Sequence, residues 1–180
     1  MNSLKKLARS SLCLVALGYS TNVFADSAAQ ILKYTYTDTS LGGYTMPYTL
    51  FLPANYDPSG PALPVILYLH GAGERGTNNT SQINGNMQPL IDATQGGTGN
   101  QRAIVIAPQC PNGQVWNSIN AGDNWTPGGT NISSYAETPA QQAARPISNA
   151  LQAAIDILDY TKTTQKTDSQ RLYVTGLSMG

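Results

Sequence analysis

The order of apolar and polar residues predicts an α/β fold with a mostly parallel sheet and helices on both of its faces. Two unbroken apolar runs, at residues 64–69 and 103–107, have the length and composition of strands that are buried on both faces. A helical pattern and a further strand, at residues 171–175, follow them along the chain. Strands and helices that alternate in this order favour parallel pairing.

The first part of the chain predicts an antiparallel pair of strands. Residues 31–37 and 45–52 alternate between apolar and polar side chains, as strands with one exposed face do. Gly42 and Gly43 lie between them at the position of a turn, so the two strands are expected to pair and to open the sheet. Residues 55–64 contain three prolines and a glycine and are predicted to form a surface loop.

Two helices and a connecting turn are predicted after the first buried strand. A weak helix covers residues 87–94 and is ended by a glycine pair. A longer helix runs to about Tyr160, and its apolar face is formed by Ile147, Leu151, Ile155 and Leu158. Residues 162–170 are predicted to be a polar turn that leads into the buried strand at 171–175.

The N-terminus has the pattern of a secretory signal peptide. Three basic residues precede a short apolar core at residues 12–17, and small residues follow at the position that a signal peptidase reads. Cleavage is expected after Ala25, which makes residues 1–25 the signal peptide and the mature protein secreted or periplasmic. The apolar core is far shorter than the roughly 20 residues that span a bilayer, so no membrane anchor is expected.

The charge of the chain argues against two classes of partner. Ten Lys and Arg residues balance ten Asp and Glu residues, and charged residues make up only 11% of the chain. Nucleic acids and anionic membrane surfaces attract proteins with clustered positive charge, so neither is expected as a partner.

Cys110 is the only cysteine after the predicted signal peptide. An odd cysteine in an exported chain is either a free thiol or pairs with a cysteine that this sequence does not contain. A nucleophilic Cys110 is the less favoured alternative, because the chain has no second histidine to activate the thiol.

The clearest functional motif is Gly-Leu-Ser-Met-Gly at residues 176–180, directly after the predicted strand at 171–175. A G-x-S-x-G sequence at the end of a strand is typical of a nucleophile elbow, in which a strained turn exposes the serine Oγ. Glycines are needed on both sides because a side chain would collide with neighbouring backbone. Ser178 is therefore a candidate nucleophile, and it requires a histidine base and a carboxylate.

A second motif, His-Gly-Ala-Gly-Glu-Arg-Gly at residues 70–76, follows the buried strand at 64–69. His-Gly-x-Gly after a strand is typical of a loop that donates a backbone N–H to an oxyanion hole, where small residues let the backbone approach the developing charge. His70 is the only histidine in the chain. We expect it to be structural, with its ring bonded to nearby main chain, because the base of this triad order follows the serine.

Together with Ala-Pro-Gln-Cys-Pro at residues 107–111, these motifs resemble those of secreted bacterial α/β-hydrolases. The group is labelled predicted peptidase, carboxylesterase or phospholipase/carboxylesterase-like, and it is related to polyhydroxybutyrate depolymerases and feruloyl esterases. The resemblance covers about residues 31–180. It implies that residues 26–180 are the N-terminal part of an α/β-hydrolase domain that is truncated after the nucleophile elbow.

The resemblance also implies how the site is built. Ser178 is the nucleophile, and the backbone N–H groups of Ala72 and Met179 form the oxyanion hole. The acid and the histidine of the triad are expected beyond residue 180, so the 180-residue chain alone is expected to be inactive. No metal and no organic cofactor is implied.

The expected function is that of an exported serine carboxylesterase, which hydrolyses a small-molecule or polymer-linked ester through an acyl-serine intermediate. Two alternatives stay open at this point. One is a serine peptidase of the prolyl-oligopeptidase type, which shares the elbow. The other is a catalytically dead hydrolase fold that binds polysaccharide.

The segment from Cys110 to Glu137 fits no helix or strand and is too long for an ordinary connection. It leaves the carboxyl end of the strand at 103–107, where α/β sheets bind ligands. It contains both tryptophans, Trp116 and Trp125, which we expect to line a substrate cleft for a sugar, aryl or acyl group. In the alternative interpretation, the two rings only pin the loop to the protein body.

Overall fold

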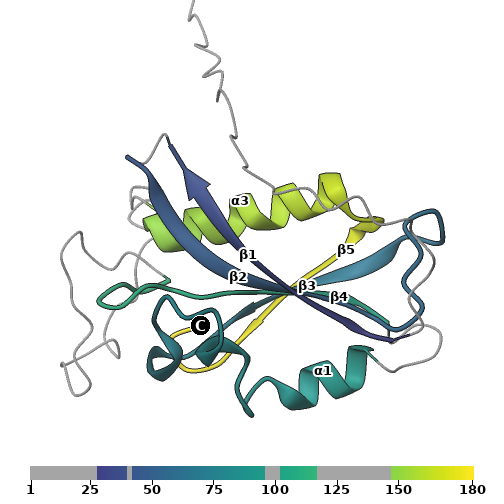
Figure 1. Cartoon of the computed structure of the whole chain (residues 1–180), viewed down its shortest axis with the longest axis horizontal. Coiled ribbons are helices and arrows are strands. Elements are labelled where there is room, and N and C mark those ends of the chain that lie inside the picture. Colours follow the sequence, from purple (N-terminus) through teal and green to yellow (C-terminus); the bar gives the residue numbers. More distant parts are fainter. Residues whose placement is uncertain (1–27, 40–41, 96–101, 117–146) are drawn as a thin grey trace, which may run out of the picture.

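The computed structural model describes residues 28–39, 42–95, 102–116 and 147–180. A five-stranded sheet forms the middle of the molecule (Figure 1). Its strands are β1 (Gln30–Asp38), β2 (Tyr44–Leu52), β3 (Leu63–Leu69), β4 (Ile104–Pro108) and β5 (Thr167–Gly176). The described helices are α1 (Gln88–Gln95), α3 (Asn149–Thr164) and the short 3-10 helices η1 (Ala72–Glu74) and η2 (Ser81–Ile83).

The sheet is mixed, with the strand order β1-β2-β4-β3-β5. β1 pairs antiparallel with β2, which confirms the predicted opening pair, and β2 is also antiparallel to β4. β3 is parallel to both of its neighbours, β4 and β5. This parallel part brings the carboxyl ends of β3 and β5 to the same edge of the sheet, with Gly176 opposite Leu69.

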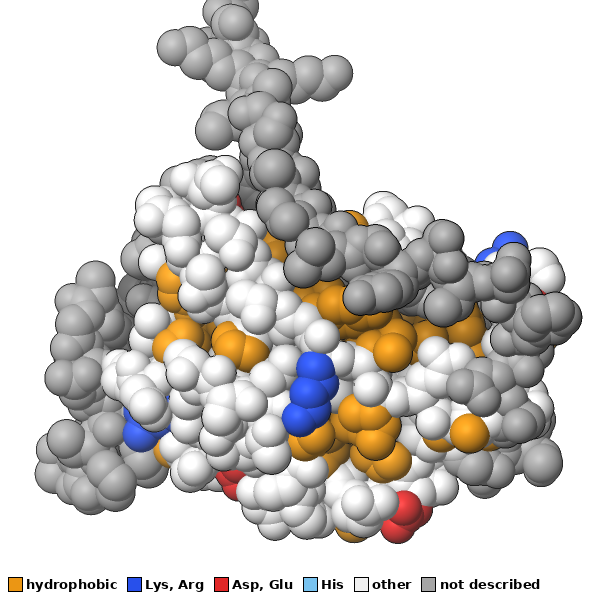
Figure 2. All heavy atoms as spheres, viewed as in Figure 1, with side chains coloured by type: hydrophobic (Ala, Val, Ile, Leu, Met, Phe, Trp, Pro, Cys, Tyr) orange, Lys and Arg blue, Asp and Glu red, His pale blue; other side chains and the backbone are white. Residues whose placement is uncertain are grey.

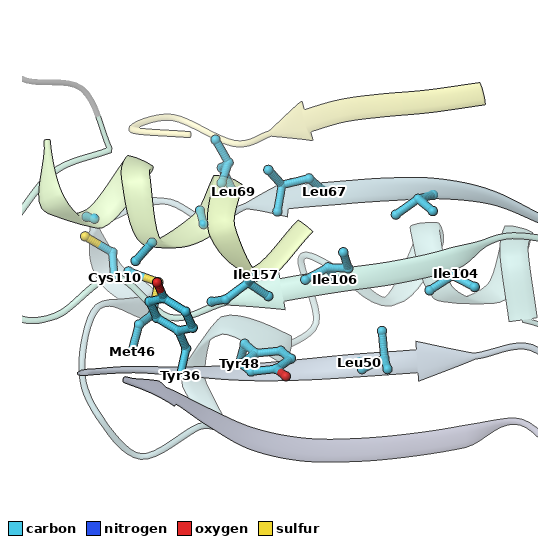
Figure 3. Packing of buried hydrophobic residues seen from close by; sticks show 14 of the residues in the cluster. Tyr36, Met46, Tyr48, Leu50, Leu67, Leu69, Ile104, Ile106, Cys110 and Ile157 are labelled. Carbon is cyan, nitrogen blue, oxygen red and sulfur yellow. The ribbon is translucent and has the colours of Figure 1, made fainter. Parts of the chain in front are cut away.

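Helices cover both faces of the sheet, as the sequence predicts (Figure 1). Alternate side chains of a strand point to opposite faces, and β4 shows this directly. Ile104 and Ile106 point toward α3 and pack in the larger core cluster with Ile157 (Figure 3). Val105, between them, belongs to a second cluster, against which Ile91 of α1 packs.

β2 differs from the prediction, because it is buried along most of its length rather than half-exposed. Every residue from Met46 to Leu52 is buried. The strand has a hydrogen-bonded neighbour on each side, and its residues contribute to the core clusters on both faces. The polar Thr49 fits this interior because its hydroxyl donates a 3.0 Å hydrogen bond to Oδ1 of Asn79.

The predicted polar turn at residues 162–170 is also wrong in most of its length. α3 continues to Thr164, and β5 begins at Thr167. The first half of β5 is polar, and its side chains are exposed or half-buried. Asp168 Oδ2 accepts a 2.6 Å hydrogen bond from Arg171 Nε at this irregular start of the strand.

β5 pairs with β3 alone among the described strands. The sequence predicts a buried strand at residues 171–175, but Leu172, Tyr173 and Val174 are 37%, 53% and 65% exposed. The prediction of burial is wrong for the described part of the chain, because none of its helices or strands covers the outer side of β5. The prediction of a strand that ends at the elbow is confirmed.

The face of the molecule in Figure 2 carries few charges, in keeping with the composition. Figure 2 shows one face, on which apolar side chains form several patches between uncharged polar groups, with few Lys, Arg, Asp or Glu side chains. Within the described ranges, no helix is long and apolar enough to cross a membrane. The predicted signal peptide, residues 1–25, lies outside the described residues.

We predict that the core between α3 and the sheet dominates the stability. Ile106→Ala removes a side chain that is 0% exposed and leaves a cavity, so we expect the free energy of unfolding to fall by about 2–5 kcal/mol. The matched control is Ile31→Ala on β1, where the side chain is 58% exposed and the loss should stay below about 1 kcal/mol. Urea-induced unfolding of the full-length variants measures both, and equal losses would contradict this packing.

Candidate active site

Ser178 lies in a tight turn directly after β5. Its φ angle is +56°, a left-handed backbone conformation that residues other than glycine rarely adopt. The turn is closed by a 3.0 Å hydrogen bond from Gly180 N–H to Leu177 O, and Leu177 N–H donates to Leu69 O at 3.1 Å. The serine is exposed. A strained and exposed serine at a strand end is the geometry of a nucleophile elbow.

The two glycines of the motif are required by the end of β3. A Cβ atom added to Gly176 would lie 2.8 Å from Leu69 O and 2.5 Å from the carbonyl carbon of Gly180. A Cβ atom added to Gly180 would overlap Leu69 O. The predicted reason for these glycines, a collision with neighbouring backbone, is therefore confirmed.

The loop that follows β3, residues 70–79, packs beside the elbow. A Cβ atom added to Gly71 would lie 3.5 Å from Ser178 Cβ and 3.4 Å from Leu177 O. Between the loop and the elbow is an open hollow of about 450 Å³, lined by Gly71, Ala72, Gly73, Glu74, Arg75, Leu177 and Ser178. The structure thus brings together two of the predicted site residues, Ser178 and Ala72.

The two predicted oxyanion-hole donors are the backbone N–H groups of Ala72 and Met179. Within the described residues, neither Ala72 N–H nor Met179 N–H donates a hydrogen bond to another group. Ala72 is the first residue of η1, where a helical N–H has no partner inside the helix. Met179 directly follows the candidate nucleophile. Two free N–H groups suit an oxyanion hole, and the assignment itself stays a prediction.

His70 is completely buried and uses both ring nitrogens on the main chain. Nδ1 donates to Gly71 O at 2.6 Å, and Nε2 accepts a 2.9 Å hydrogen bond from Cys110 N–H. A carbonyl can only accept and an N–H can only donate, so the ring is held as the neutral Nδ1–H tautomer. Burial lowers the pKa of His70. The expectation that its ring bonds nearby main chain is confirmed.

Trp116 lies under the same loop and is only 2% exposed. Its indole Nε1–H donates to His70 O at 2.9 Å, and its ring meets the His70 ring edge-on at 5.1 Å. Of the two interpretations left open by the sequence, this position favours a ring that pins the chain rather than one that lines a cleft. Trp125 lies outside the described residues.

Glu74 and Arg75 also line the hollow, and neither was predicted from the sequence as a site residue. Glu74 is buried, and its Oε1 accepts hydrogen bonds from Nδ2 of Asn84 and of Asn86 at 3.1 and 3.0 Å. Arg75 Nε donates to Ala72 O at 2.9 Å. Two adjacent charged residues inside a small-residue motif, in a chain with only 11% charged residues, are a signal that could have identified them.

Cys110 is a buried free thiol. Burial raises its pKa to about 12, so the thiol stays protonated near neutral pH and is a poor nucleophile. The nucleophilic alternative for Cys110 is therefore disfavoured. The described ranges contain no group of three or more His, Cys, Asp or Glu side chains that could hold a metal ion.

No protein-family model matches the chain, and no curated protein is detectably similar to it in sequence. Solved structures do match. A thermostable esterase aligns with a TM-score of 0.61 and 29% identity over 83% of this chain and 35% of its own. A ferulic acid esterase aligns with a TM-score of 0.52 and 17% identity over 86% of this chain and 52% of its own. The chain thus spans about a third to a half of these structures, and its fold is α/β-hydrolase-like.

Backbone strain at Ser178 predicts that a glycine variant is more stable than an alanine variant. A left-handed φ costs a residue with a Cβ atom about 1 kcal/mol, and this cost is absent for glycine. We therefore expect the Ser178→Gly protein to unfold at a higher temperature than the Ser178→Ala protein, by a few degrees. Thermal unfolding of both variants measures this, and a more stable Ala variant would show that the turn is not strained.

Burial of neutral His70 predicts that its contribution to stability falls in acid. The folded-state pKa is lowered, so the contribution is complete above the unfolded-state pKa of about 6.5 and is lost as pH falls toward the lower folded-state value. The slope is at most about 1.4 kcal/mol per pH unit. We expect the stability gap between wild type and His70→Gln to narrow from pH 8 to pH 5. Parallel pH profiles would contradict this assignment.

Proposed function

We propose that the protein is an exported carboxylic-ester hydrolase that uses Ser178 as its nucleophile. The observation that carries the proposal is the elbow, where a strained, exposed serine stands beside the 70–79 loop over an open hollow. The fold supports the same class of activity, since both structures described above are esterases. Strained backbone conformations cluster at functional sites, which supports a catalytic role for Ser178.

In this proposal, Ser178 Oγ attacks the ester carbonyl carbon and forms a tetrahedral intermediate. The negative charge on the former carbonyl oxygen is stabilised by the free N–H groups of Ala72 and Met179. Collapse of the intermediate releases the alcohol and leaves an acyl-serine. Water then attacks the acyl carbon, and the acid is released while Ser178 regains its proton.

Ser178 needs a base, and His70 does not fit that role. Both nitrogens of the His70 ring already bond main-chain atoms, so Nε2 has no lone pair to offer to the serine proton. In our proposal, a histidine and a carboxylate that follow the elbow in chain order complete the triad. No metal or organic cofactor takes part in this chemistry.

The substrate in this proposal is a small-molecule or polymer-linked ester. One matched structure is a ferulic acid esterase, and an ester of an aryl acid is therefore the substrate that we propose to test. Export through the predicted signal peptide, residues 1–25, would bring the enzyme to such material outside the cytoplasm. Neither a nucleic acid nor a membrane anchor belongs to the proposal.

The test uses the full-length protein and two serine variants. Ser178→Ala removes the nucleophile and leaves the turn in place, so we expect hydrolysis of p-nitrophenyl acetate to fall by about four or more orders of magnitude. The melting temperature should barely change. The matched control is Ser169→Ala, the same substitution at an exposed position of β5, which should keep wild-type activity.

Two further measurements separate the esterase from the peptidase and from the binding protein. A fluorophosphonate should label the wild type and Ser169→Ala but not Ser178→Ala. Faster turnover of a prolyl p-nitroanilide than of the ester would favour the peptidase. Absence of both labelling and turnover in the wild type would favour a binding protein.

His70→Ala should lower the melting temperature and should cost far less activity than Ser178→Ala. An equal loss of activity without a change in melting temperature would assign His70 to catalysis.

A further inference from the structure

The segment that follows β4, residues 109–116, holds the 70–79 loop in place. The two are far apart in the sequence, but hydrogen bonds join them at both ends of the loop. At His70, Nε2 accepts from Cys110 N–H and the carbonyl oxygen accepts from Trp116 Nε1–H, both at 2.9 Å. Further along the loop, Gly76 N–H donates to Cys110 O at 3.0 Å, and an Arg75 guanidinium nitrogen donates to Gln114 O at 3.3 Å. The loop is therefore shaped by its neighbour rather than by its own sequence alone.

Gln109 contacts the second half of this loop. Its side chain is 0% exposed and is enclosed by the chain from Glu74 to Asn79. Nε2 donates to Glu74 O at 3.1 Å and to Asn78 Oδ1 at 3.0 Å. Oε1 accepts a 2.7 Å hydrogen bond from Asn79 N–H. The amide therefore uses both of its donors and its acceptor on one short stretch of chain.

The position of Gly76 shows how closely the loop surrounds this amide. Gly76 has a φ angle of +151°, and a Cβ atom added there would lie 3.1 Å from Gln109 Nε2. The Gln109 backbone is itself fixed, since its N–H donates to Pro47 O of β2 at 2.8 Å. Gln109 thus connects the loop to the sheet. The loop is also bonded to the sheet through Asn79, which accepts from Thr49 Oγ1 and donates to the carbonyl oxygens of Tyr34 and Tyr48.

We propose that Gln109 is a positioning residue for the oxyanion hole, which acts through the 70–79 loop and does not touch substrate. Glu74, whose carbonyl oxygen accepts from Gln109 Nε2, is the last residue of η1, and Ala72 is its first residue. A shift at one end of so short a helix moves the other end. The inference rests on the proposed function, because it assigns to Ala72 N–H the role of an oxyanion donor.

The chain offers a matched control in Gln82, another glutamine that is 0% exposed. Its Nε2 donates to Asn79 Oδ1 at 2.6 Å and to Thr49 Oγ1 at 3.3 Å. Its one hydrogen bond to the described loop goes to the Asn79 side chain, away from η1. Replacing either glutamine by methionine keeps the length of the side chain, removes the amide and leaves buried partners unsatisfied.

The test compares Gln109→Met with Gln82→Met in the full-length protein. We expect both variants to melt at lower temperatures. Only Gln109→Met should lower kcat for p-nitrophenyl acetate, by about ten- to a hundredfold, with KM changed less than about threefold. An alkylboronic acid, which forms a tetrahedral adduct on the serine, should bind Gln109→Met more weakly by a similar factor. Gln82→Met should stay within about threefold of wild type in all three constants.

A second variant guards against a loss of folding. Gln109→Glu keeps the acceptor for Asn79 N–H and loses the amide donors, so it should show the same selective fall in kcat. Unchanged kcat in a folded Gln109 variant of an active enzyme would overturn the inference, and so would equal falls in the Gln109→Met and Gln82→Met proteins. A wild type that neither reacts with a fluorophosphonate nor hydrolyses the ester would instead overturn the proposed function.

Discussion

The parallel register between β3 and β5 is the constraint on which the candidate site depends. It places Gly176 opposite Leu69, so that the elbow and the 70–79 loop leave the same edge of the sheet from adjacent strands. Leu69 O then accepts the hydrogen bond of Leu177 N–H, and the glycines of the elbow lie against the same carbonyl. A change of register by one residue would separate Ser178 from Ala72 and turn every β5 side chain to the opposite face. The relative position of Ser178 and Ala72 is therefore set by the pairing of β3 with β5.

Beneath that edge, the protein replaces part of its hydrophobic interior with hydrogen-bonded polar groups. His70, Gln82, Gln109 and Thr49 are all completely buried. A buried polar group is costly unless it is paired, so each of them constrains the chain that supplies its partners. This explains how a loop of small residues, with little side-chain surface to pack, keeps one conformation beside an open hollow. Apolar core packing against α3 stabilises the sheet, and hydrogen bonds from the buried polar groups hold the loop against the sheet.

The parts that could be predicted from the sequence are those with local causes. Continuous apolar runs identified β3 and β4, and the spacing of two glycines around a serine identified the elbow, because only glycine allows so close an approach to Leu69 O. The parts that could not be predicted depend on partners distant in the sequence. β2 is buried because it pairs with β1 and β4, and Trp116 is buried because it packs on His70. Nothing in the local sequence around Gln109 indicates that its amide meets residues 74–79.

The strained residue and the groups that hold it in place are separate in this architecture. Ser178 is exposed and held at a φ angle that costs energy, while the groups that hold the turn and the adjacent loop are buried or bonded to main chain. Strain persists only where the surroundings over-determine the conformation, and here the surroundings are the end of β3 and the segment that follows β4. His70 illustrates the same division, since an imidazole ordinarily titrates near neutral pH, yet both nitrogens of this buried ring bond main-chain atoms and join two backbone segments. A histidine so engaged holds the loop, and in the proposed mechanism it is not the base for Ser178.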